Sequence, residues 1–234
     1  MPNTSFEYLN PLAVYKAKIG MDTIERDRIC ASIDADHFAN NTDSTETNSW
    51  TGDVHGFSNL HESVVYSSLF KEINKYLWDY VRKLGVRTEY ISLYHSRSWA
   101  VRQAGQQAVA KHQHEQSHIS LVYYPRIPES GRKFVVHFDS QPNEFCPSLF
   151  SNEHRKKGLV DETAPLSRNG KALKVETDTL LIFPSKTEHS VPPNEGSSKD
   201  VRYSISSDII CTLRKGVNDY EHLTPSPTSW SKVI

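Results

Sequence analysis

The chain has 234 residues, and its 27 Lys and Arg against 28 Asp and Glu leave a formal net charge of -1 at neutral pH. This balance argues against broad binding to nucleic acid or to a membrane surface. No run approaches the ~20 apolar residues of a membrane span. The length suits one domain of barrel or sandwich type with a full core, so we expect a single domain over residues 1–234.

Cysteine usage indicates a reducing compartment. Cys30, Cys146 and Cys211 lie far apart and form no CxxC pair, which is typical of free thiols. Residues 1–10 lack the basic start and the apolar run of a secretory signal. We therefore expect a cytoplasmic protein.

The N-terminal part, residues 1–88, is predicted to be a helical support. Residues 6–19 read as a strand or extended arm, residues 22–37 as a short helix with Asp22 as a possible N-cap, and residues 40–56 as a loop. Within that loop, Trp50 is expected to be a surface anchor rather than part of a substrate wall. Residues 62–84 form the clearest helix, because apolar residues recur at steps of three and four and Gly85 follows as a cap. The apolar residues of this stripe are Leu69, Ile73, Leu77, Tyr80, Val81 and Leu84.

After residue 85 the pattern becomes strand-like. Short strand segments separated by turn signals cover residues 90–94, 98–101, 108–112, 119–124, 133–139, 174–183 and 201–213. Such a series predicts an all-β barrel or sandwich, here over residues 89–215. Residues 141–170 lack periodicity and read either as a functional lid or as a disordered insertion. The polar tail, residues 216–234, is expected to be disordered or to pack on a partner subunit, so a homodimer is possible.

Three histidines stand out by their placement. His112 and His114 lie two residues apart before a strand-like run, and side chains at i and i+2 of a strand point to the same face. His189 follows the apolar run 180–183 at a bend marked by proline. Neutral imidazole is a good ligand for Fe, Zn, Cu or Ni. A His-x-His pair alone is weak evidence, since surface strands carry such pairs by chance, but the three together suggest one mononuclear metal site.

A basic anchor follows the last of these histidines. Arg202 lies 13 residues after His189 (202 − 189), and Ser204 shares its strand face. A guanidinium pairs bidentately with a carboxylate, and a hydroxyl two residues further on adds a second donor. A 2-oxo diacid could therefore chelate iron at one end and bind Arg202 and Ser204 at the other. Taken alone, Arg202 would more often be an ordinary ion-pair partner.

These residues belong to longer motifs that resemble a known family. The motifs are SWA at 98–100, HxHxxSxxSxxYY at 112–124, FPSxxxHxV at 183–191 and RxSxS at 202–206. Jointly they resemble the Fe(II)- and 2-oxoglutarate-dependent oxygenases, and most closely their bacterial and phage group, over roughly residues 90–208. The resemblance implies a mainly β fold with a double-stranded β-helix (jelly-roll, cupin-like) core behind the N-terminal helices.

The resemblance also implies the chemistry. His112, His114 and His189 are expected to be the catalytic metal ligands, and Arg202, Ser204 and Tyr123 to bind 2-oxoglutarate. The cofactors would be Fe(II), 2-oxoglutarate as co-substrate and O2. Succinate and carbon dioxide would be released as an unactivated C–H bond of a small molecule or amino-acid-type substrate is hydroxylated; desaturation and halogenation are related outcomes.

One position departs from the family's usual set of two histidines and a carboxylate, in which the carboxylate lies two residues after the first His. Here that position is His114. His114 can itself be a ligand, which is the reading we favour. Alternatively, water or a halide fills the position, or Glu115 or Asp139 supplies a carboxylate.

Two other functions compete with this hypothesis. A three-histidine cupin-type dioxygenase would need no 2-oxoglutarate, but it leaves Arg202 and Ser204 without a role. A non-catalytic jelly-roll protein that binds a small molecule or a sugar would make the histidine arrangement coincidental.

Overall fold

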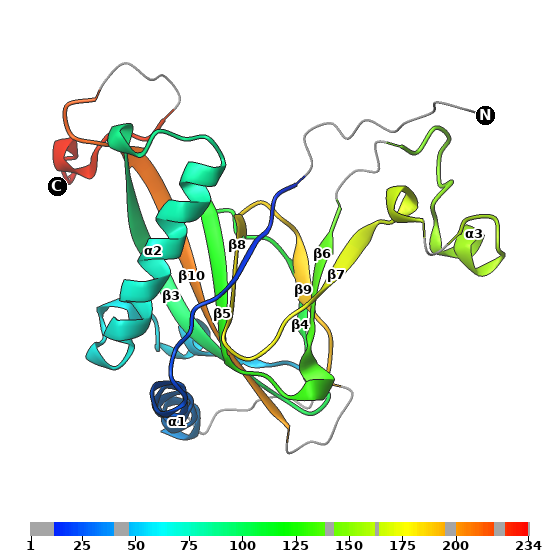
Figure 1. Cartoon of the computed structure of the whole chain (residues 1–234), viewed down its shortest axis with the longest axis horizontal. Coiled ribbons are helices and arrows are strands. Elements are labelled where there is room, and N and C mark those ends of the chain that lie inside the picture. The colour runs from blue at the N-terminus through cyan, green and yellow to red at the C-terminus, as the bar shows by residue number, and fades with distance from the viewer. Residues whose placement is uncertain are drawn as a thin grey trace.

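Two antiparallel β-sheets face each other in the computed structural model, which describes residues 12–39, 47–138, 143–161, 164–194, 200–217 and 223–233. The larger sheet has the strand order β1-β8-β5-β10-β3-β2, and the smaller has the order β4-β9-β6-β7. Helices α1 (Thr23–Ala39) and α2 (Ser67–Lys83) cover the outer face of the larger sheet (Figure 1). This arrangement confirms the predicted mainly β class with N-terminal helices and a jelly-roll core.

The ten strands of the described ranges divide between the two sheets as follows. The larger sheet contains β1 (Tyr15–Lys18), β8 (Thr179–Pro184), β5 (Ile119–Arg126), β10 (Val201–Leu213), β3 (Ile91–Ala104) and β2 (Trp50–Thr51). The smaller sheet contains β4 (Val109–His112), β9 (His189–Val191), β6 (Lys133–His137) and β7 (Gly170–Lys174).

The two helices form where capping and periodicity predict them. The Asp22 carboxylate accepts a hydrogen bond from the Glu25 N–H at 2.9 Å, which confirms the predicted N-cap of α1. In α2 the predicted stripe is buried except for Leu84, which lies just beyond the helix and is 51% exposed. The helix begins at Ser67 rather than at residue 62, because 3-10 turns at Leu60–Glu62 and Val64–Tyr66 precede it.

The central strands β5, β8 and β10 are buried on both faces. Leu121, Tyr123 and Ile205 pack toward the helices in one core cluster. Val122 and Tyr124 alternate with them and pack toward the smaller sheet in a second cluster. Side chains on the inner face of the larger sheet therefore point into the space between the two sheets, where the histidines lie.

Several elements differ from the sequence-based prediction. The segments 90–94 and 98–101 belong to one long strand, β3, and β7 was not predicted. Trp50 is only 2% exposed and belongs to the core, so the surface-anchor interpretation was wrong. It contacts His37 and Phe57 by its ring, which explains its burial.

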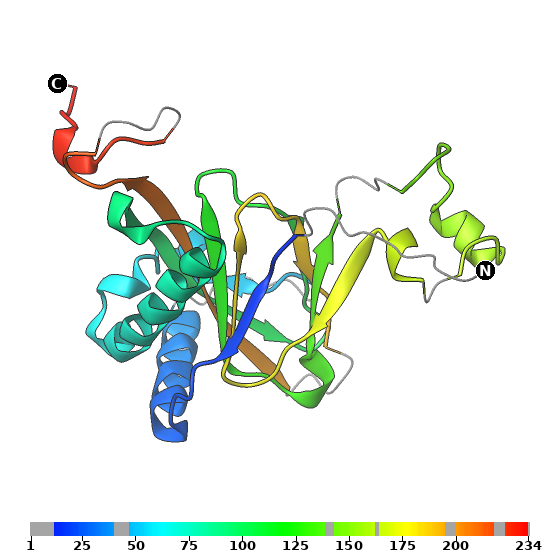
Figure 2. The same ribbon diagram turned by 45° about the horizontal axis from the view of Figure 1, so that its top comes forward.

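The expected lid contains the short helix α3 (Asn152–Lys156). Both views place α3 away from the two sheets, beyond the ends of β6 and β7 (Figures 1 and 2). None of the described residues 143–161 lines the central pocket. Among all helices in the described ranges, none combines the length and apolar character needed to cross a membrane.

Candidate metal centre and co-substrate pocket

Three imidazoles converge between the sheets. β4 and β9 pair antiparallel with His112 directly opposite His189. One ligand atom from each of His112, His114 and His189 lies within 4.8 Å of those of the other two. The ring centroids are 4.3 Å apart for His112 and His189, and 5.2 and 5.3 Å from these two to His114. The structure thus brings together the three histidines that the sequence singled out.

His114 reaches this point from a loop and not from a strand. β4 ends at His112, and the chain from 113 to 118 has no regular structure. We expected strand alternation to point the His112 and His114 imidazoles to the same place. The two rings do lie close together, but strand geometry is not the cause, because His114 lies outside the strand. Instead, the His114 N–H donates to the Ser185 carbonyl at 3.0 Å, which ties this loop to the end of β8.

The partners of the three Nδ1 atoms assign the tautomers. His112 Nδ1 lies 2.8 Å from the Ala110 carbonyl oxygen, and His189 Nδ1 lies 2.9 Å from that of Thr187. A carbonyl oxygen can only accept, so each Nδ1 must carry the proton. In a neutral ring this leaves Nε2 with a free lone pair, the form that binds a metal ion.

Burial keeps these ligands neutral. Removal from water lowers the pKa of His189 to about 3, although the Thr187 carbonyl opposes this shift. Burial likewise lowers the pKa of His112. Both imidazoles are therefore unprotonated near neutral pH, as a metal site requires.

His114 has a different partner. Its Nδ1 lies 2.5 Å from Oδ1 of Asp208, a carboxylate on β10 that is 2% exposed. Burial by itself would raise the pKa of Asp208, but hydrogen bonds from His114, Arg97 and Ser120 outweigh it, and the pKa is lowered. Sequence reasoning missed Asp208. It continues the alternation of Arg202, Ser204 and Ser206 along one strand, and that signal could have found it.

The second group of polar side chains surrounds Arg202. Its side chain is 2% exposed, and Nη1 donates to the carbonyls of Gly131 and Lys133 at 2.9 and 2.8 Å. Its guanidinium lies over the Tyr124 ring, 4.6 Å from the centroid. Within the described part of the chain, neither Arg202 Nη2 nor the Tyr124 hydroxyl has a hydrogen-bond partner. A buried donor left unpaired costs about 1–3 kcal/mol, so these atoms suit a bound anion.

Tyr123 does not join this group. Strand β5 turns its side chain toward the helices, where its hydroxyl donates to Asp178 at 2.9 Å. The prediction that Tyr123 binds 2-oxoglutarate is not supported by this placement. Its neighbour Tyr124 points to the opposite face and lines the pocket instead. Ser204, which is 8% exposed, lines the pocket, and its role in binding 2-oxoglutarate stays a prediction.

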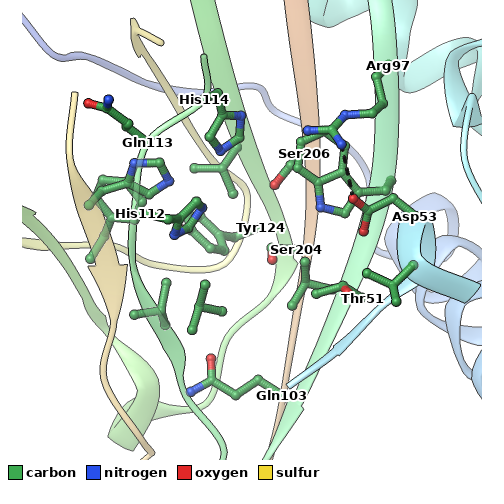
Figure 3. Close-up of a pocket in the computed structure, with 18 of the residues that line it drawn as sticks. Thr51, Asp53, Arg97, Gln103, His112, Gln113, His114, Tyr124, Ser204 and Ser206 are labelled. Atoms are coloured by element: carbon green, nitrogen blue, oxygen red, sulfur yellow. Dashed lines mark hydrogen bonds and ion pairs between the residues drawn. The ribbon is translucent and has the colours of Figure 1, made fainter. Parts of the chain in front are cut away.

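The histidines and the Arg202 group line one cavity of about 440 Å³. Figure 3 shows His112, His114, Tyr124 and Ser204 around it, with Arg97 and Asp53 at one side. Arg97 Nη1 lies 3.4 Å from Asp53, and its guanidinium stacks 4.3 Å from the Trp99 ring centroid. The complete lining is Thr51, Asp53, Val54, Arg97, Trp99, Val101, Gln103, Val109, His112, Gln113, His114, Glu115, Gln116, Val122, Tyr124, Phe134, His189, Val191, Arg202, Ser204 and Ser206.

The structure bears on the alternatives for the third ligand. Glu115 lines the cavity, but the cluster with ligand spacing found in the described ranges consists of the three histidines alone. Asp139 lies outside the described residues. The donor set present is therefore three imidazoles, which fits a divalent transition metal such as iron(II).

Comparison with known proteins agrees with this geometry. The family model described as "Putative 2OG-Fe(II) oxygenase" matches residues 97–208. A search by sequence against curated proteins found no match.

Three solved structures share this fold. HygX from Streptomyces hygroscopicus, solved with nickel and 2-oxoglutarate, is 11% identical over 85% of this chain and 82% of its own, with a TM-score of 0.53. A prolyl-4-hydroxylase from Pseudomonas putida is 8% identical over 85% and 92%, also with a TM-score of 0.53. The non-heme alpha-ketoglutarate-dependent carbocyclase SnoK, from nogalamycin biosynthesis, is 12% identical over 89% and 84%, with a TM-score of 0.54.

The matched segment contains the three histidines, Arg202 and Asp208, and the fold around it is the oxygenase jelly-roll. Residues 97–208 belong to the superfamily of 2OG-Fe(II) oxygenases.

Proposed function

We propose that the protein is an Fe(II)- and 2-oxoglutarate-dependent hydroxylase of a small-molecule or amino-acid-type substrate. The observation that carries this proposal is the pairing, in one cavity, of three metal-competent imidazoles with buried unpaired donors at Arg202 and Tyr124. When bound, iron(II) and 2-oxoglutarate supply the oxidising chemistry, in which O2 is consumed and succinate and carbon dioxide are released.

The histidines hold the metal from one side. His112 and His189, from the small sheet, and His114, from the adjoining loop, would hold the metal. Three protein ligands with open positions is the pattern of non-haem iron oxygenases.

Arg202 orients the co-substrate in this proposal. Because Nη1 is already fixed on two carbonyls, the guanidinium cannot rotate freely, and Nη2 is held for a ligand carboxylate. The Tyr124 hydroxyl and Ser204 add neutral donors beside it. Phe134 and Val191 add apolar side chains to the lining of the cavity.

A three-histidine dioxygenase that does not use 2-oxoglutarate fits the structure less well. It would leave Arg202 Nη2 buried without a partner, and a binding protein for a neutral ligand would leave the Arg202 charge without an anion. Oxygen consumption measured with and without 2-oxoglutarate, and with and without Fe(II), separates the three functions.

His112→Ala and His189→Ala each remove one strong ligand, and we expect each to abolish 2-oxoglutarate-dependent succinate formation. His118→Ala is the matched control: His118 lies in the same loop, is exposed, and accepts from the Cys211 N–H at 3.0 Å outside the cluster. It should retain wild-type turnover. Full activity and full iron occupancy in either His112→Ala or His189→Ala would rule the site out.

A further inference from the structure

The imidazole of His114 is held differently from the other two. His112 and His189 each donate Nδ1–H to a main-chain carbonyl, whereas His114 donates to the buried carboxylate of Asp208 at 2.5 Å. A carboxylate acceptor orients a ligating imidazole and makes it a stronger base than a carbonyl does. The position where the family's usual carboxylate ligand would stand is thus occupied by an imidazole with a carboxylate directly behind it.

The main chain around His114 is anchored, but only at its ends. The His114 N–H donates to the Ser185 carbonyl at 3.0 Å, and the Ser185 N–H donates to the His118 carbonyl at 3.1 Å. Because the segment between them is not part of a strand, no ladder fixes the direction of the His114 side chain. The ring has Asp208 as its hydrogen-bond partner and packs against the Trp99 ring, with the two centroids 5.6 Å apart.

The motif serines converge on the same carboxylate. Ser117 Oγ lies 2.7 Å from Ser185 Oγ, Ser185 Oγ lies 2.9 Å from Ser120 Oγ, and Ser120 donates to Asp208 Oδ1 at 2.9 Å. An ionised carboxylate only accepts, so the Ser120 proton must point to Asp208. Ser120 then accepts from Ser185, and Ser185 accepts from Ser117, so every proton in the chain is directed toward Asp208.

Arg97 fixes the other oxygen. Its Nη2 and Nε lie 2.9 and 3.3 Å from Asp208 Oδ2, and its Nη1 reaches Asp53. Arg97 is therefore shared between two carboxylates, and the group as a whole carries a net negative charge. That charge lies one imidazole away from a candidate metal site whose three ligands include no carboxylate.

We propose that Asp208 is the positioning residue of the third ligand: it orients His114, keeps its proton on Nδ1, and supplies through that ring the negative charge that a carboxylate ligand would bring. Ser117, Ser185 and Ser120 orient Asp208 in turn. The inference rests on the proposed function, because it assigns a role toward the metal of the same site.

The variant Asp208→Asn tests this role of Asp208, because the Asn side chain has almost the same shape as the Asp side chain. The guanidinium of Arg97 can only donate, so the new amide oxygen turns toward Arg97 and the amide NH2 turns toward His114. His114 Nδ1 must then accept, its proton moves to Nε2, and the atom that would bind the metal is blocked. We expect the affinity of the metal-free protein for Co²⁺, measured by calorimetry at pH 7.5, to fall at least about tenfold, in line with losses at comparable metal sites.

Asp53→Asn is the control for the charge network. Asp53 shares Arg97 with Asp208, but the partner of His114 Nδ1 is Asp208 and not Asp53. Its Co²⁺ affinity should stay within about threefold of wild type, a change worth only about 0.65 kcal/mol. An equal loss in both variants would overturn the proposal, because the effect would then come from Arg97 or from general electrostatics.

A second readout reports the proton directly. In metal-free protein labelled with ¹⁵N-histidine, long-range ¹H–¹⁵N spectra distinguish Nδ1–H from Nε2–H rings, and His114→Gln identifies the resonance. We expect Nδ1–H in the wild type and a shift to Nε2–H in Asp208→Asn. An unchanged tautomer together with unchanged Co²⁺ affinity would refute the role of Asp208, and thermal unfolding confirms that the variant is folded.

His112→Ala measured beside these variants separates the two claims. If wild type binds Co²⁺, His112→Ala does not, and Asp208→Asn matches wild type, the metal site stands and only the role of Asp208 fails. If wild type itself binds no Co²⁺ through His112, the proposed function fails with it.

Discussion

Arg202 is the residue whose surroundings say most about the ligand of this cavity. Nη1 of its guanidinium donates to two carbonyls, and the Tyr124 ring covers the guanidinium. Nη2 has no hydrogen-bond partner in the described chain. A buried cation with an unpaired donor lowers the stability of the fold unless an anion binds to it. The sequence singled out Arg202 by its distance from His189, but it did not show that the Tyr124 ring would lie against its guanidinium in the folded protein.

Replacing Arg202 by Gln should raise the 2-oxoglutarate concentration needed for half-maximal turnover by about tenfold or more, because a charge-assisted pair worth roughly 1.5–3 kcal/mol is lost. Arg102→Gln is the matched control. Arg102 lies on the adjacent strand β3 but pairs with Asp34 at 2.8 Å, away from the cavity. An unchanged 2-oxoglutarate requirement in Arg202→Gln would show that Arg202 is structural.

Tyr123 and Tyr124 illustrate a side-chain placement that the sequence analysis did not predict. Both Tyr123 and Tyr124 are buried, so hydrophobicity could not tell which face of β5 each occupies. Alternation from Ser120 would have placed Tyr124 on the site's side. Alternation from Arg202 would likewise have placed Asp208 on this face, but its contact with His114, 94 residues earlier in the chain, required the structure.

Helix α2 is the element that the sequence predicted best, and its packing explains why. Ile73 is fully buried between α2 and the larger sheet, in the same cluster as Leu180 and Ile182 of β8. A period of three to four residues records that burial directly. Strands β3 and β7 were harder to predict, since β3 carries polar residues on a partly exposed face and β7 has the sequence GKALK, in which polar and apolar residues do not alternate.

Ile73→Ala should lower the free energy of unfolding by about 2–5 kcal/mol, because it leaves a cavity in the core. Ile24→Ala offers a same-residue control in α1, where Ile24 is 83% exposed and a change within about 0.5 kcal/mol is expected. Urea unfolding of both variants measures the difference. Equal effects would contradict the assignment of this face of α2 to the core.

At the scale of the whole molecule, the site depends on two sheets held apart at a fixed distance. The larger sheet supplies Arg202, Ser204 and Asp208, and the smaller sheet with its adjoining loop supplies the histidines. The sequence predicted the class of this fold and the residues that meet, while the pairing of β4 with β9 and the serine chain required the structure. The division of the chain into one domain over 1–234 stays a prediction.

Burying neutral histidines makes the stability of the metal-free protein depend on pH. The pKa of His189 is about 3 in the folded protein against 6.5 for an unperturbed histidine, so between these values the unfolded chain binds a proton that the folded chain does not. Stability is therefore complete above about pH 6.5 and falls as the pH drops, by on the order of 2 kcal/mol at pH 5 from His189 alone. The lowered pKa of His112 acts in the same direction.

Urea unfolding of the metal-free protein at pH 7.5 and pH 5 measures this dependence. His189→Asn removes the titrating group, so the loss between the two pH values should be smaller in that variant. A loss of equal size in wild type and His189→Asn would show that other groups cause it.

The most direct test of the central claim is an anaerobic crystal structure with Fe(II) and 2-oxoglutarate bound. The account predicts imidazole nitrogens of His112, His114 and His189 at about 2.0–2.2 Å from one metal ion, near the usual imidazole distance for zinc, with the far carboxylate of 2-oxoglutarate on Arg202. His114 turned away from the metal, with water or Asp139 in its place, would contradict the three-histidine site. Metal bound elsewhere would contradict the whole assignment.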